Sequence, residues 1–142
     1  MFRGFCTAVL ALLLAGPAWA QAGKSELKAP PGILLERDVV YGSGGDDKLH
    51  LDLARPEKLD AAAPCIVVIH GGAWRAGDKK AHTDLIIKFA QAGYVSASVQ
   101  YRFCPKHPFP AQIEDVKCAV RYLRANADKY GIDANKPYPP TL

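Results

Sequence analysis

Residues 64–74 read Pro-Cys-Ile-Val-Val-Ile-His-Gly-Gly-Ala-Trp, and this stretch decides the fold class. Every position from Cys65 to Ile69 is apolar, whereas a strand with one solvent-facing side alternates apolar and polar residues. A short, continuous, β-branched run is typical of a strand buried on both faces of a parallel sheet. The Gly-Gly pair that follows predicts a sharp turn out of this strand.

An antiparallel hairpin is expected before this run. Residues 33–41 (ILLERDVVY) form a strand candidate, and the Gly- and Asp-rich residues 42–47 form a turn. In the next segment Leu49, Leu51 and Leu53 alternate with His50 and Asp52. This is the period-2 pattern of a half-buried strand, whose polar residues face away from the core. Arg55-Pro56 ends the hairpin.

Helix and strand patterns alternate after the buried run. Asp78 is placed to cap a helix that reaches Ala92, with Gly93 as its stop and one apolar face made of Leu85, Ile86, Phe89 and Ala90. Residues 94–99 (YVSASV) are the next strand candidate, and Pro105, Pro108 and Pro110 then mark an irregular loop.

A long helix is expected from Ala111 to Tyr130, because apolar residues recur there at steps of three and four: Ile113, Val116, Val120, Leu123, Ala127 and Tyr130. The order of elements predicts an α/β fold, with an antiparallel hairpin leading into a mostly parallel sheet with flanking helices.

The composition is that of one globular domain. The chain has 142 residues, 49% of them apolar, and 18 Lys and Arg against 14 Asp and Glu give a net charge of +4. This excludes a disordered chain, and the charges form no basic run that would indicate a nucleic-acid partner. We expect the domain to occupy residues 33–135, preceded by a flexible leader at 21–32. The three prolines of residues 136–142 predict a tail that forms no element.

The first twenty residues have the pattern of a secretory signal peptide. Arg3 precedes an apolar run that is shorter than the ~20 residues needed to span a bilayer, and Ala18-Trp19-Ala20 provides a cleavage site. The sequence therefore predicts a secreted or periplasmic protein with no membrane span after cleavage. A retained membrane anchor is the alternative.

Three cysteines remain beyond this segment, at positions 65, 104 and 118. Cys65 lies in the apolar run and is expected to be a small buried residue. Cys104 and Cys118 could form a disulfide or stay unpaired, since sequence spacing does not give the distance between them. No Cys or His cluster has the spacing of a zinc site, so no metal site is predicted.

The loop from His70 to Trp74 carries the strongest indication of chemistry. Two glycines after a buried strand allow the main chain to turn with its N–H groups outward, as the oxyanion hole of acyl transfer requires. An ordinary tight turn between a strand and a helix is the structural alternative.

Several motifs occur in a fixed order around this loop: His70-Gly71-Gly72-Ala73-Trp74, Gly77-Asp78, residues 92–95 (AGYV), Tyr101-Arg102 and residues 108–117 (PFPAQIEDVK). With them the chain resembles the N-terminal half of an α/β-hydrolase of the hormone-sensitive-lipase and feruloyl/acetyl-xylan esterase type. The resemblance implies that Gly72 and Ala73 donate their N–H groups to the oxyanion. It also implies that Gly71 permits the turn, that His70 supports the loop, and that Trp74 packs beneath the loop or against the acyl pocket.

Other residues of these motifs are expected to be scaffolding. An ion pair between Arg102 and Asp115 would steady the loop before the last helix, and separate surface charges are the alternative.

The chain departs from the family where the resemblance calls for a G-x-S-x-G nucleophile elbow. No such motif occurs in the 142 residues; Ser43 lies in a hairpin turn, Ser96 and Ser98 lie in a strand, and Ser25 lies in the leader. The family's catalytic Asp and His follow its Ser. The remaining histidines, His50, His82 and His107, are therefore expected to be exposed and not catalytic. The central position of the buried strand in the family also predicts that this chain presents it as an apolar sheet edge.

The resemblance implies a secreted serine carboxylic-ester hydrolase that uses no cofactor and acts on a small ester or an acylated polysaccharide. As given, the chain is expected to be truncated before the catalytic Ser-Asp-His and therefore inactive, unless a second half-chain completes it. A non-catalytic α/β binding module or a decayed remnant is the alternative.

Overall fold

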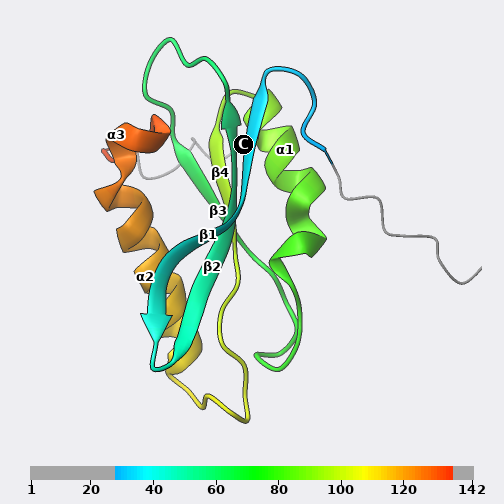
Figure 1. Ribbon diagram of the computed structural model, residues 1–142, viewed down its shortest axis with the longest axis vertical. Helices are drawn as coiled ribbons and strands as arrows, with labels where there is room; N and C mark the ends of the chain where they lie inside the picture. The colour runs from blue at the N-terminus through cyan, green and yellow to red at the C-terminus, as the bar shows by residue number, and fades with distance from the viewer. Residues whose placement is uncertain (1–27, 136–142) are drawn as a thin grey trace, which may run out of the picture.

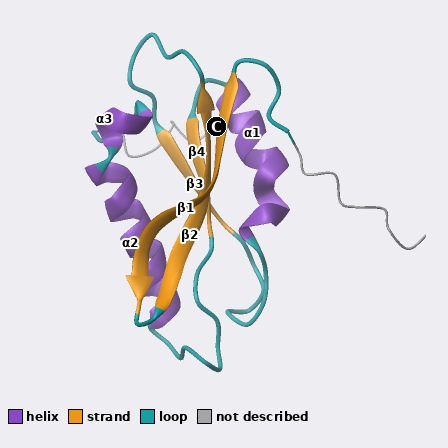
Figure 2. Cartoon of the chain, viewed as in Figure 1, coloured by secondary structure: helices purple, strands orange, loops and turns teal. Residues whose placement is uncertain are grey.

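A four-stranded sheet lies between two layers of helices in the computed structural model of the protein, which describes residues 28–135 (Figures 1 and 2). The predicted signal peptide, the leader as far as residue 27 and the predicted tail lie outside the described residues. The elements are β1 (Ile33–Gly44), β2 (Asp47–Pro56), β3 (Cys65–Ile69), the 3-10 helix η1 (Lys79–His82), α1 (Thr83–Gln91), β4 (Val95–Val99), α2 (Ala111–Ala125) and α3 (Ala127–Tyr130).

The strands lie in the order β1-β2-β4-β3. β2 pairs antiparallel with both β1 and β4, while β3 and β4 are parallel, with Val67 opposite Ala97. Their crossover through η1 and α1 is what a parallel pair needs. The predicted α/β fold, with a hairpin leading into a sheet flanked by helices, is confirmed, and the described sheet is mixed.

Helices cover both faces of the sheet. α1 packs on one face, against Ala54 and Val68, and α2 and α3 pack on the other (Figure 1). The larger core lies under α2 and α3 and contains Tyr41, Leu49, Leu51, Leu53, Ala63, Val95, Ala97, Val99, Ala119, Leu123, Tyr130 and Ile132. Within residues 28–135, none of the helices is long and apolar enough to cross a bilayer.

The alternating pattern of β2 was misleading at Asp52, because the face opposite the larger core is not open to water. η1 and α1 cover that face, and Asp52 is 0% exposed. Its Oδ1 accepts a hydrogen bond from Nζ of Lys79, the first residue of η1, at 2.5 Å. Asp52 is therefore a buried charge with a partner from another element.

The predicted apolar faces of the helices need correction at two positions. In α1, Leu85 is 37% exposed and Ile87 is buried instead. In α2, Ile113 is 42% exposed, and the buried residues are Ala111, Gln112, Asp115, Ala119 and Leu123. Gln112 and Asp115 are buried because they bind the loop before the helix, which a count of apolar residues does not register.

The helix predicted from Ala111 to Tyr130 is interrupted at Asn126. Both the main-chain N–H and the side-chain Nδ2 of Asn126 donate to the carbonyl oxygen of Tyr122, at 3.0 and 2.8 Å. Asn126 itself has φ −110° and ψ 24°, which is outside the helical region. These hydrogen bonds close α2, and α3 adds a separate turn up to Gly131.

β3 forms one edge of the described sheet, with β4 as its only neighbour among residues 28–135. Its side chains are half-buried, and Ile69 is 45% exposed. The expectation of burial on both faces is therefore not met, whereas the predicted apolar edge is present.

Candidate active site

Two loops leave the sheet at the end where the parallel strands β3 and β4 finish (Figure 1). The loop of residues 70–78 follows β3, and the loop of residues 100–110 follows β4. The hydroxyl of Tyr101 donates to the carbonyl oxygens of His70 at 2.9 Å and Gly71 at 3.4 Å. The N–H of Cys104 donates to the carbonyl oxygen of Trp74 at 2.9 Å. The second loop therefore fastens the first at both ends of the His70–Trp74 segment.

His70 is buried behind its own loop. Its ring stacks on Tyr101, with centroids 4.4 Å apart and planes 16° from parallel, and only 4% of the residue is exposed. Nδ1 lies 2.8 Å from the carbonyl oxygen of Gly71. Because a carbonyl oxygen can only accept, Nδ1 must carry the hydrogen in this bond. The ring therefore holds the main chain of the loop instead of facing solvent.

The anchored carbonyl of Gly71 sets the direction of the next amide. In a planar trans peptide the C=O and N–H groups point in opposite directions. His70 and Tyr101 hold the oxygen of Gly71 on the protein side, so the N–H of Gly72 is directed away from it. This is one of the two predicted oxyanion donors.

The second predicted donor is set in the same way. The carbonyl oxygen of Gly72 accepts hydrogen bonds from the N–H groups of Arg75 at 2.9 Å and Ala76 at 3.1 Å, so the N–H of Ala73 is directed to the opposite side. Neither the Gly72 nor the Ala73 amide has an acceptor within residues 28–135. Residues 71–78 are all exposed. The loop thus offers two unoccupied donors at the surface.

Glycine is required at two positions of this loop. Gly72 has φ +121°, and a Cβ there would lie 1.9 Å from the carbonyl oxygen of Ala76. Gly77 has φ +123°, and a Cβ there would lie 2.1 Å from Nδ1 of His70. Ala73 and Trp74 also have left-handed φ values, 52° and 63°, which are strained for residues with a side chain. The loop keeps a conformation that its own residues disfavour.

Trp74 stands at the rim of the loop. Its ring meets that of Tyr101 edge-on, with centroids 5.5 Å apart, and 47% of the residue is exposed. The predicted packing of Trp74 beneath the loop is therefore only partial, and half of the indole faces the solvent beside Ala73.

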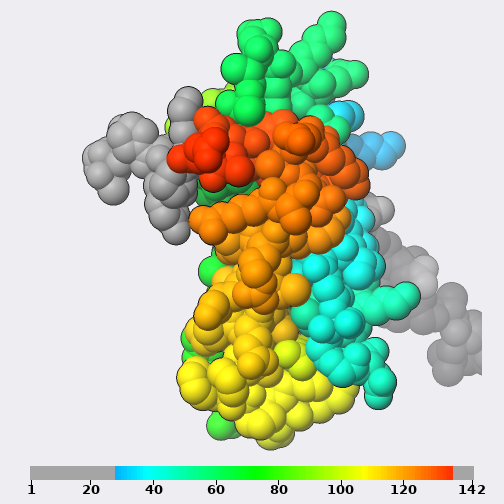
Figure 3. All heavy atoms as spheres, turned by 90° about the vertical axis from the view of Figure 1, so that its left-hand side faces the viewer, coloured from blue at the N-terminus to red at the C-terminus, as the bar shows by residue number. Residues whose placement is uncertain are grey.

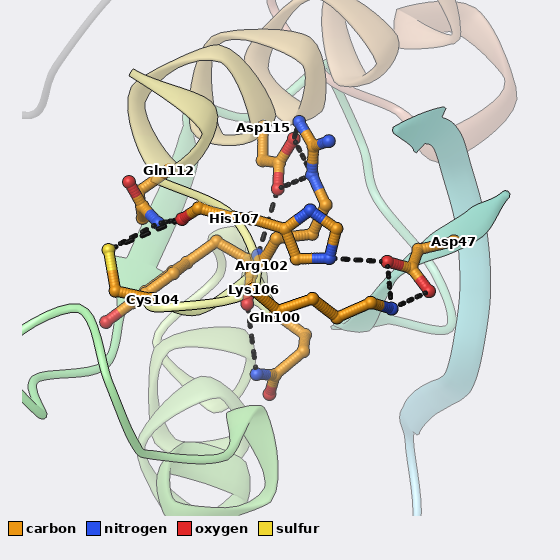
Figure 4. Close-up of polar contacts among 9 residues, drawn as sticks. Asp47, Gln100, Arg102, Cys104, Lys106, His107, Gln112 and Asp115 are labelled. Atoms are coloured by element: carbon orange, nitrogen blue, oxygen red, sulfur yellow. Dashed lines mark hydrogen bonds and ion pairs between the residues drawn. The ribbon is translucent and has the colours of Figure 1, made fainter. Parts of the chain in front are cut away.

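Asp115 of α2 binds Arg102 through both carboxylate oxygens (Figure 4). Nη2 of Arg102 donates to Oδ1 at 2.7 Å, and the main-chain N–H of Arg102 donates to Oδ2 at 2.9 Å. This hydrogen-bonded pairing raises the pKa of Arg102. The predicted ion pair is confirmed, and it ties the second loop to α2.

A second cluster joins the same loop to the β1–β2 hairpin (Figure 4), and the two segments lie side by side on the face shown in Figure 3. The carboxylate of Asp47 lies 2.7 Å from Nε2 of His107 and 3.0 Å from Nζ of Lys106. Hydrogen bonding by Lys106 lowers the pKa of Asp47. His107 is therefore half-buried and in contact with Asp47 rather than exposed as expected, and His50 and His82 are half-buried as well.

The three described cysteines are free thiols. Sγ of Cys104 lies 3.3 Å from the carbonyl oxygen of His107, and Sγ of Cys118 lies 3.7 Å from that of Tyr41. The open alternative of a disulfide between them is thereby settled in favour of separate thiols. Cys65 is half-buried, and its burial raises the pKa of its thiol to about 12.

The described serines are not presented as nucleophiles. Ser96 and Ser98 are fully buried, and their hydroxyls donate to the carbonyl oxygens of Ile86 at 2.6 Å and Lys79 at 2.9 Å. Ser43 lies in β1 and not on a turn between a strand and a helix. The residues that the structure describes contain no group of three His, Cys, Asp or Glu side chains that could hold a metal ion.

Sequence reasoning missed Lys79. It directly follows Asp78, whose carboxylate caps η1 by accepting the N–H of Lys80 at 2.7 Å, as predicted for the helix start. Lys79 itself is only 5% exposed and lies against Asp52 and Asp38. Nothing in its sequence context distinguishes it from the exposed Lys80.

Comparison with known proteins bears directly on this site. The BD-FAE family model matches residues 51–138, which include the loop from His70 to Trp74 and the Arg102–Asp115 pair. The chain belongs to the BD-FAE family. It is 37% identical to Esterase LipC of Mycobacterium tuberculosis over 101 residues, which are 70% of this chain and 25% of LipC. It is 31% identical to Carboxylesterase NlhH of the same species over 121 residues, which are 82% of this chain and 38% of NlhH.

Solved structures show the same fold. A bacterial heroin esterase superposes with a TM-score of 0.67 at 27% identity, covering 77% of this chain and 34% of that one. An esterase of Pyrobaculum calidifontis superposes with a TM-score of 0.65 at 30% identity, covering 73% and 33%. This BD-FAE chain thus belongs to the hormone-sensitive-lipase-like family of α/β-hydrolases and has part of that fold. It spans about a quarter to two-fifths of the length of these relatives.

Proposed function

We propose that this BD-FAE chain supplies the oxyanion hole of a serine-dependent carboxylic-ester hydrolase, with the N–H groups of Gly72 and Ala73 as the donors. When a nucleophile attacks an ester, the carbonyl oxygen gains negative charge, and donors already aimed at it stabilise that charge. The observation that carries the proposal is the pair of unoccupied, exposed amides whose neighbouring carbonyls are fastened on the protein side.

The proposal assigns the nucleophile and base to residues other than these 142. No Ser in the chain lies in G-x-S-x-G, and His70 is committed to the main chain of its loop. An oxyanion hole without a nucleophile and base binds a carbonyl oxygen but does not form the acyl-enzyme. The 142-residue chain alone is therefore inactive, and a longer chain or a second half-chain completes the site. The reaction uses no cofactor.

The ester itself is proposed from the relatives. Several of them carry the names esterase or carboxylesterase, which supports an ester as substrate. We propose a small ester or an acylated polysaccharide, as the family resemblance implies. The pattern of the first twenty residues supports export, so the reaction would occur outside the cell or in the periplasm.

A mixing experiment tests this function. The full chain is assayed with p-nitrophenyl acetate alone and after mixing with a separately produced segment of a related esterase that carries its G-x-S-x-G elbow and catalytic Asp and His. We expect no turnover above buffer alone and clear turnover on mixing. Gly72→Ala keeps the N–H but forces a Cβ to within 1.9 Å of the carbonyl oxygen of Ala76, so the loop must shift. If the shift misdirects one oxyanion donor, turnover should fall by about 10²-fold. Lys117→Ala, on the exposed side of α2, is the matched control.

Two results would contradict the proposal. If the unmixed chain hydrolysed the ester and Ser43→Ala abolished this activity, the nucleophile would lie in β1. A folded mixed complex without turnover would favour the alternative of a non-catalytic binding module or a decayed remnant. Translation of the DNA from codon 130 onward in all three frames separates these cases independently, because only the hydrolase requires a G-x-S-x-G segment there or in a partner gene.

A further inference from the structure

We infer that Lys79 is a positioning residue for the oxyanion donors: its buried ion pair with Asp52 fixes where the loop of residues 70–78 returns to the sheet. The inference rests on the proposed function for its meaning, but the contacts that carry it are independent of any ester. They begin at the side chain of Lys79 and end at the amide of Gly72.

Every polar group of Lys79 is bound to the sheet. Nζ donates to Oδ1 of Asp52 in β2 at 2.5 Å and lies 2.7 Å from Oδ1 of Asp38 in β1. Its main-chain N–H donates to Oε1 of Gln100 at 3.0 Å, and its carbonyl oxygen accepts from the hydroxyl of Ser98 at 2.9 Å. Three strands and the segment after β4 therefore hold one residue.

Burial makes this attachment hard to release. Lys79 is 5% exposed and Asp52 is 0% exposed, so separating them would leave a buried charge without its partner. Burial alone lowers the pKa of Lys79, but the hydrogen bonds and charges of Asp38 and Asp52 outweigh it and raise the pKa overall. Lys79 is therefore charged at neutral pH, and its Nζ is held beside the carboxylates of Asp38 and Asp52.

The attachment reaches the donors through Gly77. Only Asp78 separates Lys79 from Gly77. A Cβ at Gly77 would lie 2.1 Å from Nδ1 of His70 and 2.6 Å from the carbonyl oxygen of Gly71. The main chain at Gly77 therefore closes directly over the hydrogen bond between His70 and Gly71. Because that bond directs the N–H of Gly72, a shift of the return segment would move the donor.

The strain at Asp38 supports the same conclusion. Asp38 has a left-handed φ of 53° within a bulge of β1, where the pairing with β2 shifts register between Glu36 and Val39. In that conformation its N–H donates to Oδ1 of Asp52 at 2.9 Å, while its carboxylate contacts Lys79. Strained residues persist where the surrounding structure determines their conformation. The bulge delivers a second carboxylate to Lys79.

Nuclear magnetic resonance of the full chain tests the inference without any ester. In Lys79→Met we expect the amide peaks of Gly72 and Ala73 to shift and their heteronuclear NOE values to fall, while the peak of Leu123 in α2 stays in place. Lys79→Arg should restore most of the wild-type positions, because it returns the charge. Lys80→Met, the exposed neighbour, should leave the Gly72 and Ala73 peaks unchanged.

Asp38→Asn provides a second variant if Lys79→Met does not fold. Asn tolerates a left-handed φ and keeps the N–H bond to Asp52, so only the second carboxylate of Lys79 is lost. We expect smaller shifts of the same two peaks in the same direction. Unchanged Gly72 and Ala73 peaks in either folded variant would overturn the inference. If the mixing assay gives no turnover but Lys79→Met still moves the Gly72 and Ala73 peaks, only the proposed function is overturned.

Discussion

Tyr101 holds His70 twice, through a ring stack at 4.4 Å and through a hydroxyl that donates to the carbonyl oxygen of His70 at 2.9 Å. The stack fixes the imidazole plane, and the hydroxyl fixes the main chain from which the loop begins. Burial raises the pKa of Tyr101, so its hydroxyl remains a donor at neutral pH. Tyr101 therefore links the end of β4 to the first residue of the loop of residues 70–78.

Tyr101→Phe removes the hydroxyl and keeps the ring. The carbonyl oxygen of His70 would lose a buried donor, so we expect the free energy of unfolding to fall by about 1–3 kcal/mol. Urea unfolding followed by fluorescence measures this change. Tyr94→Phe serves as a control, since the structure shows no hydrogen bond to the hydroxyl of Tyr94 within residues 28–135. Equal loss in both variants would mean that the Tyr101 hydroxyl does not hold the loop.

Asp115→Ala tests the pair that ties the second loop to α2. The guanidinium of Arg102 and its main-chain N–H would both lose their acceptor, and we expect the free energy of unfolding to fall by about 3 kcal/mol. Glu114→Ala removes a neighbouring exposed carboxylate and should change stability by less than about 0.5 kcal/mol. Calorimetry or urea unfolding of the two variants decides the matter. A similar result for both would show that Arg102 gains little from Asp115.

The two glycines of the loop should respond differently to alanine. Gly72→Ala forces a Cβ into the carbonyl oxygen of Ala76 at a φ of +121°, and we expect a loss of about 1–3 kcal/mol in stability. Gly71→Ala meets no atom within 4 Å and should cost less than about 0.5 kcal/mol. Urea unfolding compares them. If Gly71→Ala were the more disruptive, the described conformation of the loop would be incorrect.

Stability should depend on pH through Asp38. Its hydrogen bond from Lys79 lowers the pKa of Asp38 in the folded chain, so this contribution is present above the unfolded value of about 3.9 and is lost as the pH falls through the folded pKa. Lys79 has a raised pKa, so its contribution is present below the unfolded value of about 10.4 and is lost only as the pH rises through the folded pKa.

The measurement is the free energy of unfolding of wild type and Asp38→Asn at pH 6 and pH 3. Wild type should lose more stability between these values than the variant. Asp47, whose pKa Lys106 also lowers, contributes equally to both proteins and cancels in the comparison. Equal losses would show that the contact between Asp38 and Lys79 adds no stability.

The sequence was most informative where one local pattern decides the outcome. The continuous run of β-branched residues predicted β3, and the alternating leucines predicted β2. The Asp78 cap predicted the start of η1. The turn at Gly71-Gly72 could be predicted from the two glycines, because a turn that directs its N–H groups outward accepts few other residues. The Arg102–Asp115 pair followed from two motifs whose order the family fixes.

Contacts between distant elements could not be read in the same way. Asp52 was expected to face away from the core because apolar and polar residues alternate along β2. This alternation shows that the two faces of the strand differ, but it does not show that η1 and α1 cover the polar face. The sequence does not show which of Lys79 and Lys80 is buried, because this depends on how η1 packs against the sheet. Gln112 is buried because its side chain donates to the carbonyl oxygen of His107 at 2.7 Å, a pairing set by the path of the loop.

No side-chain atom belongs to the donor pair itself. Gly72 and Ala73 present main-chain N–H groups, and the groups that aim them lie on the opposite side of the loop. The carbonyl oxygens of Gly71 and Gly72 are bound within the protein, and the N–H groups that follow them are directed to the opposite side. The direction of the two N–H groups therefore depends on residues that lie outside the surface at which those groups are presented.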